Sequence, residues 1–145
     1  MQDFTRRQAL GAGAAAVAAT YLPMFDAQAA PLTYTLAPKK IADGVWMLAG
    51  AQEAINFENG GAIANITILD SKDGAIIIDT GPSKRYGEQL ANAARELTGK
   101  DIARVYLTHF HPYHVFGNQA FAPGIIAAPQ GVIDGISNMG NAFSD

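Results

Sequence analysis

The feature that most constrains the fold is an unbroken apolar run at residues 75–78, set between the polar turn 70–74 and Asp79. The run reads Ala-Ile-Ile-Ile, and its length and β-branched side chains predict a strand. Because it has no polar position to face solvent, it is expected to be buried on both faces. The preceding stretch, residues 62–69, also has the pattern of a strand and is expected to pair with it as a hairpin.

A helix and further strands are predicted around this hairpin. After Pro82 the apolar residues recur at helical spacing, and Ser83 and Gly99 are suited to begin and end that helix. The tail from Gln130 is expected to hold a short helix. Short apolar runs predict additional strands at residues 45–49, 103–107 and 124–128. This order of elements predicts an α/β layered sheet with at least one covering helix.

The N-terminus has the features of an export signal. Arg6 and Arg7 precede an Ala- and Gly-rich stretch, residues 9–21, which is too short to span a bilayer because a spanning helix needs about 20 apolar residues. Residues 27–29 then offer an A-x-A cleavage site. The pattern resembles a twin-arginine (Tat) signal peptide over residues 1–29, which implies the Tat export machinery as a partner, a periplasmic location and no stable membrane span. The alternative is a surface helix or tail that contains an arginine pair by chance.

Length and composition limit what the rest of the chain can be. The 145 residues allow one domain, which we assign to residues 45–145, with residues 30–44 as a leader segment. The net charge is -3 and the basic residues are scattered, which argues against nucleic acid as a partner. The chain has no cysteine, so it can form neither disulfides nor thiolate metal sites, and a metal must be held by histidines or carboxylates.

All three histidines fall within a window of six residues, directly after the predicted strand 103–107. In an extended segment, residues two apart point to the same side, so His109 and His111 can converge on one ion. Pro112 suits the first turn of a helix, from which His114 would project near that pair. Neutral imidazoles are ligands that zinc accepts, so the cluster predicts a zinc site. The alternative is a set of ordinary surface or helix-capping histidines.

The histidine segment resembles a known motif. Thr108 to His114 is similar to the H-x-H-x-D-H motif of the metallo-β-lactamase superfamily, and Asp79-Thr80-Gly81 and Val45-Trp46 agree with that family. The closer likeness is to the exported branch that is associated with quinoprotein dehydrogenase systems. That likeness is carried by residues 59–65, 79–83, 86–87 and 114–118.

The resemblance implies a fold and a set of site residues. The fold would be the N-terminal half of the αββα sandwich, and the site would hold one or two zinc ions. By the same resemblance, His109 and His111 would bind the first zinc and His114 the second. Asp79 would be a supporting residue beneath the site, and the alternative for it is a solvated aspartate at a strand end.

The sequence departs from the family pattern in two ways. Tyr113 occupies the position of the motif aspartate, which in the family binds the second metal. A phenol is neutral at pH 7 unless a metal ionises it, so the expected consequence is loss of the second metal, with a phenolate ligand as the alternative. No histidine follows His114, and Asp134 and Asp145 are the only later acids, so the chain is expected to be truncated.

These features favour a zinc-dependent metallohydrolase of this superfamily, truncated and weakly active or inactive alone. Its substrate would be a small molecule with a carbonyl or ester-like centre, attacked by hydroxide. The alternative is a non-catalytic, degenerate periplasmic protein that binds a metal or serves as an accessory, for example to a quinoprotein system. A third hypothesis is assembly with a complementing chain that supplies the missing ligands.

Overall fold

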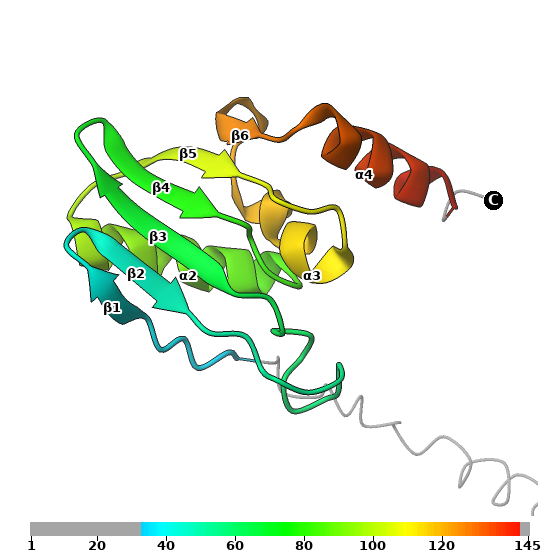
Figure 1. Ribbon diagram of the computed structural model, residues 1–145, viewed down its shortest axis with the longest axis horizontal. Helices are drawn as coiled ribbons and strands as arrows, with labels where there is room; N and C mark the ends of the chain where they lie inside the picture. The colour runs from blue at the N-terminus through cyan, green and yellow to red at the C-terminus, as the bar shows by residue number, and fades with distance from the viewer. Residues whose placement is uncertain (1–32, 143–145) are drawn as a thin grey trace, which may run out of the picture. The chain divides into compact units, whose positions relative to one another are not determined.

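The computed structural model describes residues 33–142, with side chains to residue 139, so the expected export signal at residues 1–29 lies outside the described residues. Within this part, six strands form one sheet in sequence order (Figure 1). The strands are β1 (Lys39–Ala42), β2 (Val45–Leu48), β3 (Ile66–Ser71), β4 (Gly74–Ile78), β5 (Ile102–Tyr106) and β6 (Ile126–Ala127). The helices are α2 (Lys84–Thr98), α3 (Pro112–Val115) and α4 (Gln130–Ala142), with two 3-10 turns, η1 (Phe116–Ala120) and η2 (Pro123–Ile125).

The strand directions place the end of β4 beside the end of β5. The pairs β1–β2, β2–β3 and β3–β4 are antiparallel, whereas β4–β5 and β5–β6 are parallel. The predicted hairpin is confirmed, with Ile68 opposite Ile77 and Leu69 opposite Ile76. Because α2 is the crossover between two parallel strands, β4 and β5 end at the same edge of the sheet. The histidine segment follows β5 at this edge.

Helix α2 begins and ends at the residues that the sequence predicts. The Ser83 hydroxyl accepts a hydrogen bond from the backbone N–H of Tyr86 (3.2 Å), which is a standard N-cap. At the other end Gly99 adopts φ 67°, the left-handed conformation that glycine favours after a helix. Leu90 and Ala94 are fully buried on the side that faces the sheet.

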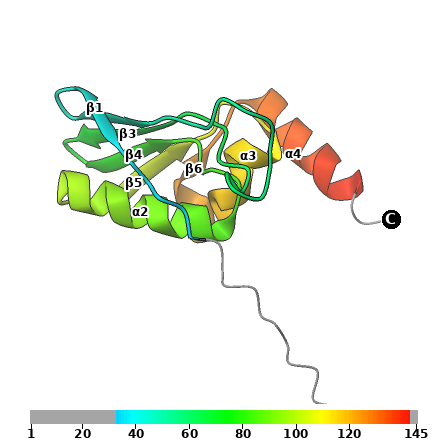
Figure 2. The same cartoon turned by 90° about the horizontal axis from the view of Figure 1, so that it is seen from below.

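The two faces of the sheet differ in burial. Side chains from the central strands that point toward α2 are fully buried: Ile66, Ile68, Ala75, Ile77 and Val105. On the other face Ile76 and Ile78 are only half-buried and Tyr106 is 44% exposed. Figure 2 shows α2 against one face and none of the described helices over the other. The expectation that the run 75–78 is buried on both faces is therefore wrong for the described residues, because α2 covers only one side.

Part of the segment predicted as a leader belongs to the sheet. Strand β1 lies within residues 30–44 and pairs with β2, and its four residues are all exposed, so no apolar pattern marked it. Upstream of β1, Tyr34 exchanges two backbone hydrogen bonds with the Gln89 side chain on α2, both 3.1 Å long. Its ring also stands edge-on to Tyr86, with 4.9 Å between the centroids. These contacts attach the segment to the covering helix.

Two other strand predictions need correction in detail. Strand β3 begins at Ile66, so residues 62–65 of the predicted strand 62–69 lie in the preceding loop. There the Asn65 side chain accepts a hydrogen bond from the backbone N–H of Gly50 (3.0 Å). Strand β5 runs from Ile102 to Tyr106 rather than over residues 103–107. Only Val105 in it is fully enclosed, since β5 lies near the edge of the sheet with only the two-residue β6 beyond it.

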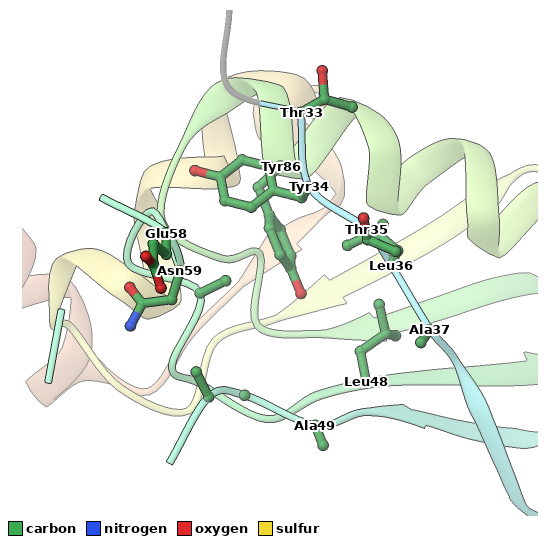
Figure 3. Close-up of a pocket in the computed structure, with 13 residues that line it drawn as sticks. Thr33, Tyr34, Thr35, Leu36, Ala37, Leu48, Ala49, Glu58, Asn59 and Tyr86 are labelled. Atoms are coloured by element: carbon green, nitrogen blue, oxygen red, sulfur yellow. The ribbon is translucent and has the colours of Figure 1, made fainter. Parts of the chain in front are cut away.

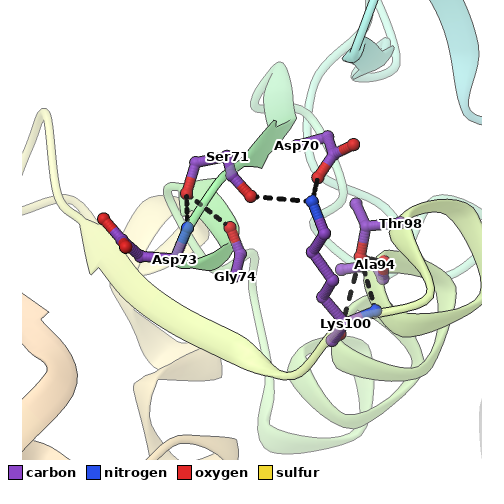
Figure 4. Close-up of polar contacts among 7 residues, drawn as sticks. All are labelled: Asp70, Ser71, Asp73, Gly74, Ala94, Thr98 and Lys100. Carbon is purple, nitrogen blue, oxygen red and sulfur yellow. Dashed lines mark hydrogen bonds and ion pairs between the residues drawn. The ribbon is translucent and has the colours of Figure 1, made fainter.

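At the far end of the sheet, Lys100 connects the end of α2 to the β3–β4 turn. Its Nζ lies 2.6 Å from Asp70 Oδ1 and donates to the backbone carbonyl of Ser71 at 2.9 Å (Figure 4). Thr98, at the last turn of α2, donates its hydroxyl to the carbonyl of Ala94 (2.8 Å). None of the helices within residues 33–142 has the length and apolar character to span a membrane.

Candidate metal centre

The loop after β5 and the short helix α3 position the three histidines. His109 and His111 lie in the loop, and His111 is the N-cap residue of α3 with extended backbone dihedrals. Pro112 occupies the first helical position, as predicted, where its fixed φ starts the turn that carries His114. The His111 side chain makes no capping hydrogen bond, which argues against the helix-capping alternative.

The structure brings the three imidazole rings together. The centroids of His109 and His111 are 4.1 Å apart at an interplanar angle of 86°, and those of His109 and His114 are 5.4 Å apart at 68°. Within residues 33–142, however, no three His, Asp or Glu side chains converge in a geometry that could hold a metal ion. The donor chemistry therefore suits zinc, while the arrangement is that of an incomplete site. Metal binding by these residues stays a prediction.

Asp79 lies beneath this cluster and is 2% exposed. Its carboxylate accepts hydrogen bonds from the backbone N–H and the hydroxyl of Thr108 (2.8 and 2.5 Å) and lies 2.8 Å from His114 Nδ1. An ionised carboxylate can only accept, so Nδ1 of His114 is the donor in this contact. This burial excludes the solvated alternative, and the contact is the kind that orients a metal-binding imidazole.

The backbone of Asp79 is as constrained as its side chain. It adopts φ 63°, the only positive value at a non-glycine residue of the described part of the chain. Its N–H donates to the carbonyl of Tyr106 (2.8 Å), which joins the ends of β4 and β5. The left-handed conformation is uncommon for aspartate, and strain of this kind concentrates at functional sites.

The loop after β4 holds α3 by contacts between segments that lie far apart in the sequence. Thr80 N–H donates to the carbonyl of His114 (2.8 Å), and its hydroxyl lies 2.9 Å from Asn118 Oδ1. Gly117 N–H donates to the carbonyl of Gly81 (3.0 Å). A Cβ at Gly117 would lie 2.0 Å from the carbonyl oxygen of Thr80, so the two segments meet backbone to backbone. Residue chemistry alone does not predict these contacts, and the resemblance of residues 79–83 and 114–118 to the exported branch was the signal that marked them.

Tyr113 faces a histidine rather than standing apart. Its hydroxyl lies 2.8 Å from Nδ1 of His111, and its ring centroid is 4.9 Å from that of His114. The tyrosine is half-buried and packs against the hydrophobic core. It therefore has a defined place between two of the three histidines.

His109 contacts Phe110 face to face and the other two histidines edge-on. Phe110 stacks on it, with centroids 4.9 Å apart at 25°, and Phe110 in turn packs on α4, where a Cβ at Gly135 would lie 2.5 Å from its ring. Loss of water around the ring and then the nearby His111 and His114 lower the pKa of His109, and Asp79 opposes that shift. The lowered pKa favours a neutral imidazole, which is the form that binds metals.

A cavity of about 450 Å³ lies elsewhere, between residues 33–37, the end of β2, residues 58–62 and Tyr86 (Figure 3). None of the three histidines lines it. Burial, followed by the charge of Tyr34, raises the pKa of Tyr86 to about 12, so its hydroxyl stays protonated. The cavity and the histidine cluster are thus separate features.

The chain is an α/β protein whose sheet presents a histidine motif where two parallel strands end, supported by a buried aspartate. The family model described as "Metallo-beta-lactamase superfamily" matches residues 59–141. The chain belongs to this superfamily.

Solved structures of the superfamily share the fold. The metallo-β-lactamase FIM-1 from Pseudomonas aeruginosa, in its mono-zinc form, superposes with a TM-score of 0.62 at 22% identity, covering 76% of this chain and 49% of that one. The enzyme from Erythrobacter litoralis, with β-mercaptoethanol in its active site, gives 0.59 at 21% identity, covering 75% and 48%. The chain thus spans about half the length of the solved structures it matches.

One curated protein is similar over a shorter segment. The linear primary-alkylsulfatase of Pseudomonas sp. (strain ATCC 19151) is 35% identical over 54 residues, which are 37% of this chain and 10% of the alkylsulfatase. The expected α/β metallo-β-lactamase fold is confirmed by these likenesses and the family match, over part of the fold.

Proposed function

We propose that this chain is a zinc-binding, hydrolase-type domain whose own residues supply part of a metal centre. The observation that carries the proposal is the meeting of three imidazoles beside a buried carboxylate that fixes the ring nitrogen of His114. Such a carboxylate–histidine pair is the usual outer support of a zinc ligand. The lowered pKa of His109 favours the neutral form of that imidazole, which is the form that binds a metal.

His109 and His111 would hold the ion, and His114 would face it from α3. When bound, zinc supplies a Lewis acid that makes a water ligand acidic near neutral pH. Asp79 holds His114 in one tautomer, while Thr108 keeps that carboxylate in place. Phe110 shields one face of His109 from water and ties the loop to α4.

The proposed activity of the chain by itself is weak or absent. Catalytic zinc sites usually have three protein ligands, and the described residues offer no such group of three. The remaining ligands would come from outside residues 33–142 or from a complementing chain. Substrates to test are small carbonyl or ester-like molecules, and the likeness to an alkylsulfatase adds sulfate esters.

The second candidate is a degenerate periplasmic protein that binds a metal without catalysis. It is favoured by the Tyr113 hydroxyl, which contacts His111 at the position where the family motif has a metal-binding aspartate. Export through the Tat machinery, a periplasmic location and service to a quinoprotein system are part of both proposals. Export and location rest on the residue pattern at 6–29. The link to a quinoprotein system rests on the likeness at residues 59–65, 79–83, 86–87 and 114–118.

The test is zinc stoichiometry of the purified full chain, measured by mass spectrometry after dialysis. We expect substoichiometric to one zinc per chain, and its loss in His109→Ala. The control is Asp73→Ala, an exposed residue in the β3–β4 turn, at the edge of the sheet opposite the histidine segment. Zinc content that does not change in His109→Ala would contradict the proposed site.

Turnover of a chromogenic β-lactam, carboxylate ester and sulfate ester separates the two candidates. Hydrolysis that requires zinc and disappears in His109→Ala would favour the enzyme. Stable zinc binding without turnover of any of the three would favour the non-catalytic protein.

A further inference from the structure

Tyr113 makes a contact that the family motif does not explain. Its hydroxyl lies 2.8 Å from Nδ1 of His111, and its ring is wedged beside His114 at an interplanar angle of 47°. Tyr113 lies in α3, and its ring packs against the hydrophobic core. The core contact and the hydroxyl contact together define where the side chain lies. His111 is therefore the group on which the Tyr113 hydroxyl can act.

This contact parallels the one between Asp79 and His114. In both pairs an oxygen lies 2.8 Å from Nδ1 of the imidazole, and in both Nε2 is the nitrogen left free. Metal-binding histidines ordinarily have such an oxygen partner on their second nitrogen. The carboxylate can only accept a hydrogen bond, and a phenol can accept one as well, through the lone pairs of its oxygen.

We infer that Tyr113 is a positioning residue for His111 and lies outside the coordination sphere. The inference rests on the proposed zinc function. Nδ1–H of His111 donates to the phenol oxygen, which turns Nε2 toward the ion. The motif position at which the family has a metal-binding aspartate would thus carry a residue, Tyr113, that orients another metal ligand, His111.

The consequence is a centre for one ion. With Tyr113 committed to His111, a second ion would have only His114 from the motif, and a single imidazole does not hold zinc. The Tyr113 ring lies beside both histidines, with its centroid 5.4 Å from that of His111 and 4.9 Å from that of His114.

The test compares Tyr113→Phe with the wild-type full chain. Phenylalanine keeps the ring and removes only the hydroxyl, so the packing against His114 is retained. The matched control is Tyr106→Phe, which removes a hydroxyl from a tyrosine that is 44% exposed on the sheet. We expect zinc affinity in Tyr113→Phe to fall by about tenfold, the lower end of effects seen when such partners are removed, with stoichiometry unchanged.

A spectroscopic readout separates positioning from general destabilisation. In the zinc-loaded, ¹⁵N-labelled wild type, ring correlations of His111 should show a protonated Nδ1 and a metal-bound Nε2, and Tyr113→Phe should lose this single state. Copper(II)-loaded wild type should show no phenolate-to-copper charge-transfer band. A band that Tyr113→Phe abolishes would make Tyr113 a ligand and overturn the inference.

The other outcomes are also decisive. Unchanged affinity and unchanged His111 correlations in Tyr113→Phe would overturn the positioning role while leaving the proposed zinc function standing. Weaker binding with unchanged His111 correlations would show a structural effect only, and would overturn it too. A wild-type chain that binds no zinc would fail the proposed function itself, and the inference with it.

Discussion

The two faces of the sheet carry the same types of residue but are buried to different extents. Toward α2, Ile66, Ile68 and Ile77 are fully buried, whereas on the other face Ile76 and Ile78 are half-buried. Figure 2 shows why: among the described elements, the long helix lies along one face only. The difference teaches that an apolar run specifies a strand, while the burial of each face depends on which element covers it.

The elements on the covered face also position the histidine segment at the edge of the sheet. Helix α2 packs against η1 through glycines, since a Cβ at Gly87 would lie 2.5 Å from the carbonyl oxygen of Gly117. Gly117 in turn abuts Thr80, which bonds to the backbone of His114. The position of His114 is thus linked through backbone contacts to the helix that buries the sheet. Among residues 33–142, no helix on the other face provides a comparable link.

The largest contrast is expected between neighbouring isoleucines on β4. Ile77→Ala should lower the free energy of unfolding by about 2–5 kcal/mol, because it leaves a cavity in a filled core. Ile76→Ala should cost about 1 kcal/mol, since its side chain keeps part of its contact with water. Urea denaturation of the two variants, followed by circular dichroism, measures the difference. Equal losses would show that the second face is covered in solution.

The next effect concerns the covering layer itself. Gly117→Ala should destabilise the fold by about 1–3 kcal/mol or more, because the added Cβ would meet the Thr80 carbonyl oxygen 2.0 Å away. The matched control is Gly124→Ala, where a Cβ would meet nothing within 4 Å. Thermal melts of both variants provide the measurement. A melt of Gly117→Ala that coincides with that of Gly124→Ala would contradict the close approach of η1 to the β4–α2 loop.

Much of this architecture was predictable from local patterns. The hairpin follows from its turn residues, and α2 begins and ends at capping residues, Ser83 and Gly99. Pro112 marks the start of α3. Each of these signals acts over a few residues only. Strand β1 was missed because its side chains are all exposed and its partner, β2, carries the apolar pattern. Covering of one face only could not be read from the run 75–78, since that depends on tertiary packing.

The residues of the candidate site were predictable from the sequence, but their contacts were not. The spacing of His109, His111 and His114 and the strand-end position of Asp79 were visible in the sequence. The direction of the Tyr113 hydroxyl was not, because it depends on how the turn of α3 aims the ring at His111. The backbone contact of Gly117 with Thr80 joins segments 37 positions apart in the sequence, by the difference 117 - 80, and pattern alone does not report it.

A smaller loss of stability is expected from a change at Asp79, which follows β4. Asp79→Asn keeps the shape of the side chain, and asparagine tolerates the left-handed backbone at this position. It removes the charge that accepts hydrogen bonds from Thr108 and His114, so we expect a loss of about 1–3 kcal/mol in unfolding free energy. Urea denaturation tests it, and Asp73→Asn, an exposed residue in the β3–β4 turn, is the control. A loss no larger than that of the control would contradict the buried network.

The smallest effect is expected where α2 meets the far end of the same face. Lys100 pairs with Asp70 at 2.6 Å, but both side chains retain 35–41% of their exposure, so water and salt screen the pair. Lys100→Met should therefore cost about 1 kcal/mol or less and should matter less in high salt. Urea denaturation of wild type and variant at low and high salt measures this, with Lys72→Met in the turn as the control. If Lys100→Met cost as much as Ile77→Ala, polar contacts rather than apolar packing would be what holds α2 against the sheet.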